Sequence, residues 1–137
     1  MHITQESDYA IRIVYCLAKS SARRDARGIS EEINVSLRFS LKILGKLVQS
    51  GIVTSFKGNR GGYELARPAS EITLRHVIEA VEGEYCFSRC LKGESDCCSR
   101  GAWGSCAFQR VFAEISADVN RKLDSVSFAQ LVEGESA

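Results

Sequence analysis

The sequence lacks the long apolar run that a membrane-spanning helix requires. Such a helix needs about 20 consecutive apolar residues, and no stretch of this 137-residue chain approaches that length. The N-terminus also lacks a basic region followed by an apolar one, so it does not resemble a secretory signal peptide. These absences predict a cytoplasmic protein with no membrane partner, in a compartment where thiols stay reduced.

Motifs that mark common catalytic sites are absent as well. The sequence contains no glycine-rich phosphate-binding loop, no zinc-protease motif and no Ser–His–Asp arrangement. Its two histidines, His2 and His76, are not spaced as metal ligands. We therefore expect neither an enzyme nor a small-molecule substrate.

The low net charge of +1 conceals a local asymmetry. Residues 36–67 contain six basic residues and one acidic residue, which is a net charge of +5. The remaining 12 basic and 16 acidic residues give the rest of the chain a net charge of −4. Such a basic island is either a solvated face or a localised contact with a polyanion, and charge alone leaves both interpretations open.

Apolar periodicity and capping residues predict a helix-turn-helix in the first half of the chain. The expected elements are a helix over 6–20, a polar loop over 20–28, a short helix capped by Ser30, and a helix over about 37–49 capped by Ser36. Because the last two helices are joined by only a few residues, they match the spacing of a DNA-binding helix pair.

The helix expected at 37–49 has two different faces. Its predicted buried face consists of Leu41, Ile43, Leu44, Leu47 and Val48. Its predicted exposed face consists of Arg38, Lys42, Gly45, Lys46 and Gln49. A slim, basic face suits a helix that enters the major groove. Phe39, on the flank, is either a partly buried core aromatic or a contact for a thymine methyl group.

A β-hairpin is predicted directly after this helix. Strand-like runs at 52–58 and 63–66 flank the turn Asn59-Arg60-Gly61-Gly62. A helix-turn-helix followed by a basic hairpin is the winged-helix arrangement, in which Arg60 would reach a narrow minor groove. The predicted fold class is therefore mainly α with a small β-hairpin wing.

The C-terminal part adds a helix that is suited to pairing. Between about 107 and 124, apolar residues recur at near-heptad spacing: Phe108, Phe112, Ile115, Val119 and Leu123. This pattern could pack within the chain or against a second copy, and we favour a long dimerisation helix. The predicted organisation is a winged-helix domain over 1–83, a cysteine-rich loop over 84–106, and the dimerisation helix and tail over 107–137.

The cysteine-rich segment CLKGESDCCSRGAWGSC contains four of the six cysteines, between Cys90 and Cys106. In a reducing compartment, this clustering favours a metal or redox role over structural disulfides. The segment lacks the C-x2-C-x2-C spacing of ferredoxins and the paired CxxC motifs of common zinc folds. A structural zinc site and a thiol–disulfide switch nevertheless remain alternatives.

Five collinear stretches together resemble the Rrf-two family of bacterial winged-helix regulators. They are SDYAIRIVYCLA (7–18), KILGKLVQSGIV (42–53), KGNRGGYELARP (57–68), EITLRHVIEAVEG (71–83) and LDSVSFAQL (123–131). The resemblance implies a homodimer that binds a palindrome-like operator in double-stranded DNA. Together with the basic faces described above, it predicts DNA contacts from Ser36, Arg38, Phe39, Ser40, Lys42, Lys46, Lys57, Asn59, Arg60 and Gly61.

The resemblance also implies an iron–sulfur cluster, with two or four iron atoms, that senses iron–sulfur status, nitric oxide or redox state. Cluster-bearing members of the family carry three cysteines before the long helix, and these match Cys90, Cys98 and Cys106. Cys97 is the alternative to Cys98, since neighbouring residues in extended chain point opposite ways.

The resemblance leaves the fourth ligand of such a cluster open. No histidine follows Cys106 as it does in one branch of the family. In another branch, an aspartate from the partner's first helix binds the cluster, and Asp8 stands at the matching position. Cys86 is the competing candidate from the same chain.

Overall fold

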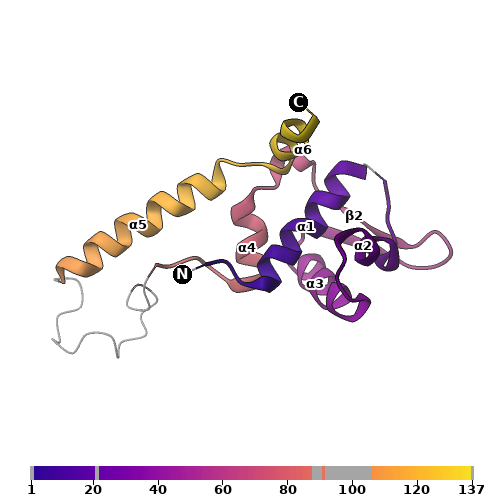
Figure 1. The fold of residues 1–137 in the computed structure, drawn as a ribbon, viewed down its shortest axis with the longest axis horizontal. Coiled ribbons are helices and arrows are strands. Elements are labelled where there is room, and N and C mark those ends of the chain that lie inside the picture. Colours follow the sequence, from indigo (N-terminus) through magenta and orange to yellow (C-terminus); the bar gives the residue numbers. More distant parts are fainter. Residues whose placement is uncertain (1, 21, 88–90, 92–105, 137) are drawn as a thin grey trace.

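The computed structural model describes residues 2–20, 22–87, 91 and 106–136 (Figure 1). Its elements are α1 (Gln5–Ser20), α2 (Ala26–Ile33), α3 (Leu37–Gln49), β1 (Val53–Phe56), β2 (Gly62–Leu65), the short 3-10 helix η1 (Ala69–Glu71), α4 (Leu74–Glu82), α5 (Ala107–Asp124) and α6 (Phe128–Ser136). This mainly helical chain with one antiparallel hairpin confirms the predicted fold class. Helix α5 and the hairpin lie at opposite ends of the long axis (Figure 1).

Helix α2 begins earlier than predicted. Asp25 caps it, because its side chain accepts a hydrogen bond from the Gly28 backbone N–H at 3.1 Å. Ser30 was the predicted cap, but it lies inside α2, where its hydroxyl donates to the Arg27 carbonyl at 2.8 Å. Aspartate and serine are comparably good N-caps, so local preference could not distinguish the two starts.

Helix α3 has the predicted bounds, but its buried face is rotated from the predicted one. Ser36 caps the helix by accepting the Phe39 N–H at 3.2 Å. The buried residues are Ser40, Ile43, Leu44 and Leu47. Leu41 is 44% exposed, so its predicted burial was wrong. Ser40 is 0% exposed and faces the interior, which removes its hydroxyl from the predicted DNA-contacting surface.

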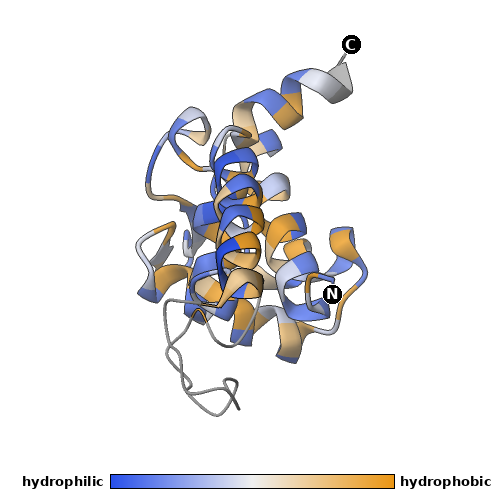
Figure 2. Ribbon diagram, turned by 90° about the vertical axis from the view of Figure 1, so that its left-hand side faces the viewer, coloured by the Kyte–Doolittle hydropathy of each residue, from blue (hydrophilic) through white to orange (hydrophobic). Residues whose placement is uncertain are grey.

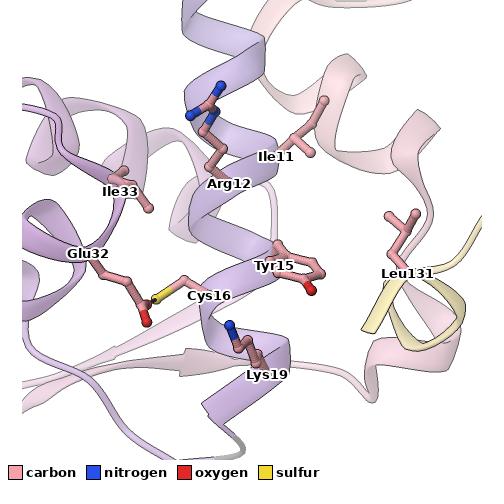
Figure 3. Close-up of a pocket in the computed structure, with 8 residues that line it drawn as sticks. All are labelled: Ile11, Arg12, Tyr15, Cys16, Lys19, Glu32, Ile33 and Leu131. Carbon is pink, nitrogen blue, oxygen red and sulfur yellow. Dashed lines mark hydrogen bonds between the residues drawn. The ribbon is translucent and has the colours of Figure 1, made fainter. Parts of the chain in front are cut away.

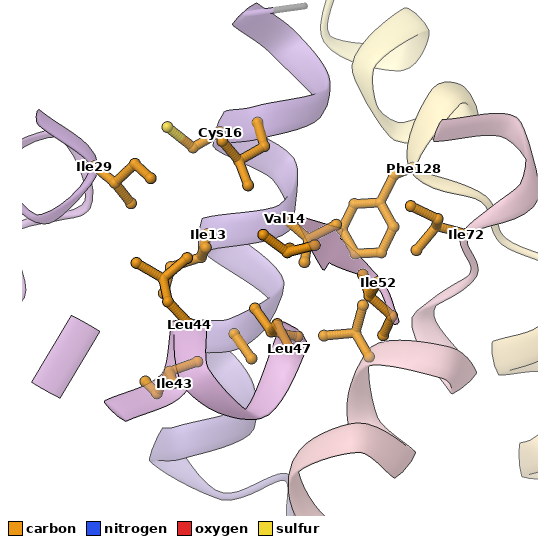
Figure 4. Close-up of a cluster of buried hydrophobic side chains, with 14 residues drawn as sticks. Ile13, Val14, Cys16, Ile29, Ile43, Leu44, Leu47, Ile52, Ile72 and Phe128 are labelled. Carbon is orange, nitrogen blue, oxygen red and sulfur yellow. The ribbon is translucent and has the colours of Figure 1, made fainter. Parts of the chain in front are cut away.

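The hydrophobic core joins both ends of the chain (Figure 4). Val14 of α1, Leu47 of α3 and Phe128 of α6 all belong to this buried cluster. The chain after α5 returns to the body by strand-like pairing, in which the Phe128 N–H donates to the Ile72 carbonyl at 3.0 Å. Helix α6 is therefore part of the winged-helix body.

Helix α5 occupies the predicted residues and leaves two of its large apolar side chains exposed. It packs on α4, and Ser116 is the single residue of α5 that is buried. Phe108 is 61% exposed and Val111 is 50% exposed. In Figure 2, in which the α5 side of the molecule faces the viewer, α5 carries both hydrophobic and hydrophilic residues. In the described part of the chain, no helix is both long and apolar enough to cross a membrane.

Candidate nucleic-acid interface and cysteine segment

The exposed face of α3 carries the basic residues that the sequence placed there. Arg38, Lys42 and Gly45 are exposed, and Lys46 is half-buried. Glu6 of α1 lies beneath this face, with its Oε1 2.7 Å from Lys46 Nζ and 3.8 Å from Lys42 Nζ. Because the Lys42 side chain remains 59% exposed, this acid orients the cation without covering it.

Phe39 combines features of both interpretations that its sequence position allowed. Its ring meets the Tyr9 ring of α1 edge to face, with centroids 5.7 Å apart. The residue is nevertheless 36% exposed, and Lys42 Nζ lies 5.5 Å from its ring centroid. The packing against α1 fixes the ring at the edge of the basic surface.

The wing is a short hairpin whose turn depends on two glycines. Strands β1 and β2 pair in register from Val53 opposite Leu65 to Phe56 opposite Gly62. A Cβ atom on Gly61 would lie 2.6 Å from the Phe56 carbonyl oxygen. Gly62 has φ +145°, and a Cβ atom there would lie 2.6 Å from the carbonyl oxygen of Arg24. Side chains at either position would therefore displace the tip.

The tip of the wing carries the side chains that were predicted to contact DNA. Lys57, Asn59 and Arg60 are all exposed. The Gly61 N–H donates to the Gly58 carbonyl at 2.9 Å and closes the turn beneath them. Two cations are thus presented on a tight, fixed turn at the end of the molecule opposite to α5 (Figure 1).

Cys16 is a buried thiol in a charged cluster on the body (Figure 3). Its thiol donates a hydrogen bond to the Glu32 carboxylate, and Arg24 Nη1 lies 3.2 Å from Glu32 Oε2 and 3.3 Å from Cys16 Sγ. Burial, followed by the hydrogen bond to Glu32, raises the pKa of Cys16 to about 11. The same hydrogen bond lowers the pKa of Glu32. Cys16 is therefore a protonated, unreactive thiol at neutral pH.

An open pocket of about 490 Å³ lies beside this thiol, between α1, α2 and α6. It is lined by Ile11, Arg12, Tyr15, Cys16, Lys19, Glu32, Ile33 and Leu131 (Figure 3). Asp8 of α1 holds Arg12 at its edge, with Asp8 Oδ2 3.1 Å from Arg12 Nε. This predicted cluster ligand is thus already engaged in an exposed i,i+4 ion pair.

The chain on either side of the cysteine-rich segment is fixed to α5. The Phe87 N–H donates to Ser116 Oγ at 2.7 Å, and the Phe87 and Phe112 ring centroids are 5.1 Å apart. At the other side, Cys106 immediately precedes α5. Cys90, Cys97 and Cys98 lie outside the described residues.

Cys106 and Cys86 are both half-buried free thiols. Cys106 stands at the N-cap position of α5, yet its side chain makes no capping hydrogen bond. Among the described residues, no three His, Cys, Asp or Glu side chains are grouped to hold a metal ion. Asp8, Cys86 and Cys106 of one chain therefore do not form a metal site together.

The fold and the basic surface define the class of this protein, which is that of the winged-helix transcriptional regulators. A family model described as "Rrf2: Iron-dependent Transcriptional regulator" matches residues 3–134. The chain belongs to the Rrf2 (Rrf-two) family, as the sequence resemblance predicted, and it is a regulator rather than an enzyme.

Individual relatives are similar over much of the chain. Protein aau3 of Rhizobium meliloti is 37% identical over 71% of this chain, and the match spans 64% of that protein. The HTH-type transcriptional regulator IscR of Serratia proteamaculans is 28% identical over 98% of this chain and 81% of its own. The solved structure of CymR, the global cysteine regulator of B. subtilis, covers 97% of both chains with a TM-score of 0.78 and 22% identity. That structural likeness supports the fold.

Proposed function

We propose that the chain acts as a homodimeric regulator that binds a palindrome-like operator in double-stranded DNA, with α3 in the major groove and the wing in the minor groove. The observation that carries this proposal is the exposed, basic face of α3, whose opposite face is locked into the core. A helix held in this way can present cations to phosphates and short side chains to base edges.

The proposed contacts follow the exposed residues of α3 and the wing. On α3 they are Ser36, Arg38, Phe39, Lys42 and Lys46, and on the wing they are Lys57, Asn59, Arg60 and Gly61. Leu41 was assigned to the core by its periodicity, but its 44% exposure makes it an apolar candidate for a thymine methyl group. Ser40 does not belong to this set, because it is fully buried.

The exposed apolar residues of α5 support the dimer. Phe108 and Val111 would remain in water in a monomer, although apolar surface gains about 25 cal/mol per Å² when it is buried. A second copy of α5 supplies matching apolar surface, and two-fold pairing would place two α3 helices on successive half-sites.

We further propose that the cysteine segment binds an iron–sulfur cluster through Cys90, Cys98 and Cys106, with Cys97 as the alternative to Cys98. Thiolates are the usual ligands of such clusters, and the Cys106 side chain makes no capping hydrogen bond to α5. Asp8 of the partner subunit is the proposed fourth ligand and Cys86 the alternative. When bound, the cluster would supply reactivity toward oxidants or nitric oxide.

The described residues indicate how a change in the segment would reach DNA. Phe87, before the segment, and Cys106, after it, are both attached to α5, and α5 continues into α6 within the winged-helix body. A different conformation of the segment would therefore act on the helix that sets the dimer. Because two half-sites are separated by about one DNA turn, a small shift between subunits changes affinity.

The DNA proposal is tested with Arg60→Ala. The duplex would be selected by the wild-type protein from a random-sequence library, and binding would be measured by fluorescence anisotropy. We expect affinity to fall about tenfold, since loss of an arginine that contacts bases typically costs about 1–3 kcal/mol. Lys122→Ala removes an exposed cation in the last turn of α5 and should leave binding unchanged. Equal binding by wild type and Arg60→Ala would contradict the wing assignment.

The cluster proposal is tested by metal analysis of protein purified without oxygen. Iron, acid-labile sulfide and visible absorption are expected in the wild type and in Cys16→Ser, but not in Cys106→Ser. Zinc without sulfide would indicate a structural zinc site instead. A colourless, metal-free protein that cannot be reconstituted would leave the thiol–disulfide switch.

A further inference from the structure

The connection between α1 and α2 runs beside the wing. Within it, the Arg24 N–H donates to the Tyr63 carbonyl at 2.9 Å, and the Tyr63 N–H donates to the Arg24 carbonyl at 2.7 Å. This isolated antiparallel bridge attaches a third chain segment to β2. Gly62 allows the close approach, since any Cβ atom there would meet the Arg24 carbonyl oxygen.

The Arg23 side chain extends from the same connection across three parts of the wing. Its guanidinium carbon lies 3.4 Å from the centroid of the Phe56 ring on β1. Its Nη1 donates to the Arg60 carbonyl at the tip at 3.0 Å, and its Nε lies 3.7 Å from Glu64 Oε2 on β2. One planar cation thus contacts both strands and the residue that is proposed to enter the minor groove.

The connection is itself anchored to the body through Arg24. While the Arg24 backbone pairs with the wing, its side chain bonds Glu32 of α2 and Cys16 of α1. The wing is therefore linked through two adjacent arginines to the helices that support α3. A two-stranded hairpin is at best marginally stable alone, so these contacts supply the fixed base that the wing requires.

We propose that Arg23 is a positioning residue for the wing: it holds the backbone of Arg60 so that the Arg60 side chain projects from one fixed place. The inference rests on the proposed DNA-binding function. Lysine cannot replace this residue, because stacking on Phe56 together with a directed N–H bond requires the planar guanidinium group. Arg23 acts through Arg60 and is not itself assigned to DNA.

The first test needs no DNA. Amide hydrogen exchange of the wing would be measured in wild type, Arg23→Ala and Arg23→Lys. We expect the Gly61 and Tyr63 amides to exchange about tenfold faster in both variants, because each amide depends on the closed wing. Exchange within α3 should not change. Wild-type exchange rates in the Arg23→Ala wing would overturn the proposal.

The second test is a double-mutant cycle on the selected duplex. If Arg23 acts through Arg60, Arg23→Ala should weaken binding severalfold, and Arg23→Ala/Arg60→Ala should bind about as well as Arg60→Ala alone. Arg27→Ala provides the matched control, since Arg27 is an exposed cation on α2; its effect should add to that of Arg60→Ala.

The salt dependence of binding distinguishes positioning from contact. A direct phosphate contact by Arg23 would lower the slope of log affinity against log salt by about 0.9 when the residue is removed from the Arg60→Ala background. We expect no change of slope there. A lowered slope, or additive losses from the two arginines, would overturn the proposal. If the wild type selected no duplex, the DNA-binding function would fail while hydrogen exchange would still decide the role of Arg23 in the wing.

Discussion

Two phenylalanines summarise the contrast between the winged-helix body and α5. Phe128 of the body is 0% exposed, whereas Phe108 of α5 is 61% exposed. The body buries its apolar side chains within one chain, including those of the C-terminal helix. Helix α5 packs one face on α4 and leaves another uncovered. The body therefore buries its large apolar residues within one chain, while the exposed apolar residues of α5 are accounted for by the proposed dimer.

The largest expected effect tests the packing of the winged-helix body. Phe128→Ala removes a fully buried ring, which typically costs about 3–5 kcal/mol. We expect that loss in the free energy of unfolding measured with urea, at every protein concentration. Phe108→Ala should produce a loss that depends on protein concentration, because it would act through the dimer. Equal, concentration-independent losses would remove the distinction between the two regions.

The next largest effect tests the proposed dimer interface on α5. Phe108→Asp places a charge in the proposed interface and should raise the dimer dissociation constant about 100-fold, or about 2.7 kcal/mol. Sedimentation equilibrium would measure it. Ala117→Asp is the control: Ala117 is exposed and stands nine residues from Phe108, about two and a half turns away on the opposite side of the helix. Similar weakening by both variants would argue against the Phe108 face.

The same contrast explains which features could be predicted from the sequence. Local signals located α3 and α5 at their observed bounds, because cap residues and strong periodicity act within a few turns. The Ser30 cap and the burial of Leu41 were wrong, since both depend on how the helices pack together. The contacts of Arg23 and Arg24 with the wing could not be predicted from local sequence, because they join residues nearly 40 positions apart. The ligand roles of Cys90 and Cys98 stay predictions.

The buried thiol of Cys16 should make the stability of the winged-helix body depend on pH. The pKa of Cys16 is raised from 9.0 to about 11, so the unfolded chain loses this proton first as pH rises. Its contribution to stability is present below pH 9 and is lost between about pH 9 and 11, with a slope of at most about 1.4 kcal/mol per pH unit. Urea unfolding across this range should show the fall.

Two variants assign that pH dependence. Cys16→Ala should flatten the fall relative to wild type, because alanine does not titrate. Glu32→Gln should reduce it, since the carboxylate contributes to the raised pKa after burial. An identical fall in wild type and Cys16→Ala would show that the thiol is not responsible.

The smallest expected effect tests the proposed DNA-binding face of α3. Gly45 on α3 and Gly134 on α6 both have open space where a Cβ atom would stand. Alanine should therefore stabilise either helix by up to about 1 kcal/mol through helix propensity. Only Gly45→Ala adds a methyl group to the basic face of α3, so it alone should weaken binding to the selected duplex, by severalfold. If Gly45→Ala bound DNA as well as Gly134→Ala does, α3 would not approach the bases along this face. The wing, with Arg60 positioned by Arg23, would then be the principal DNA-binding element of the body.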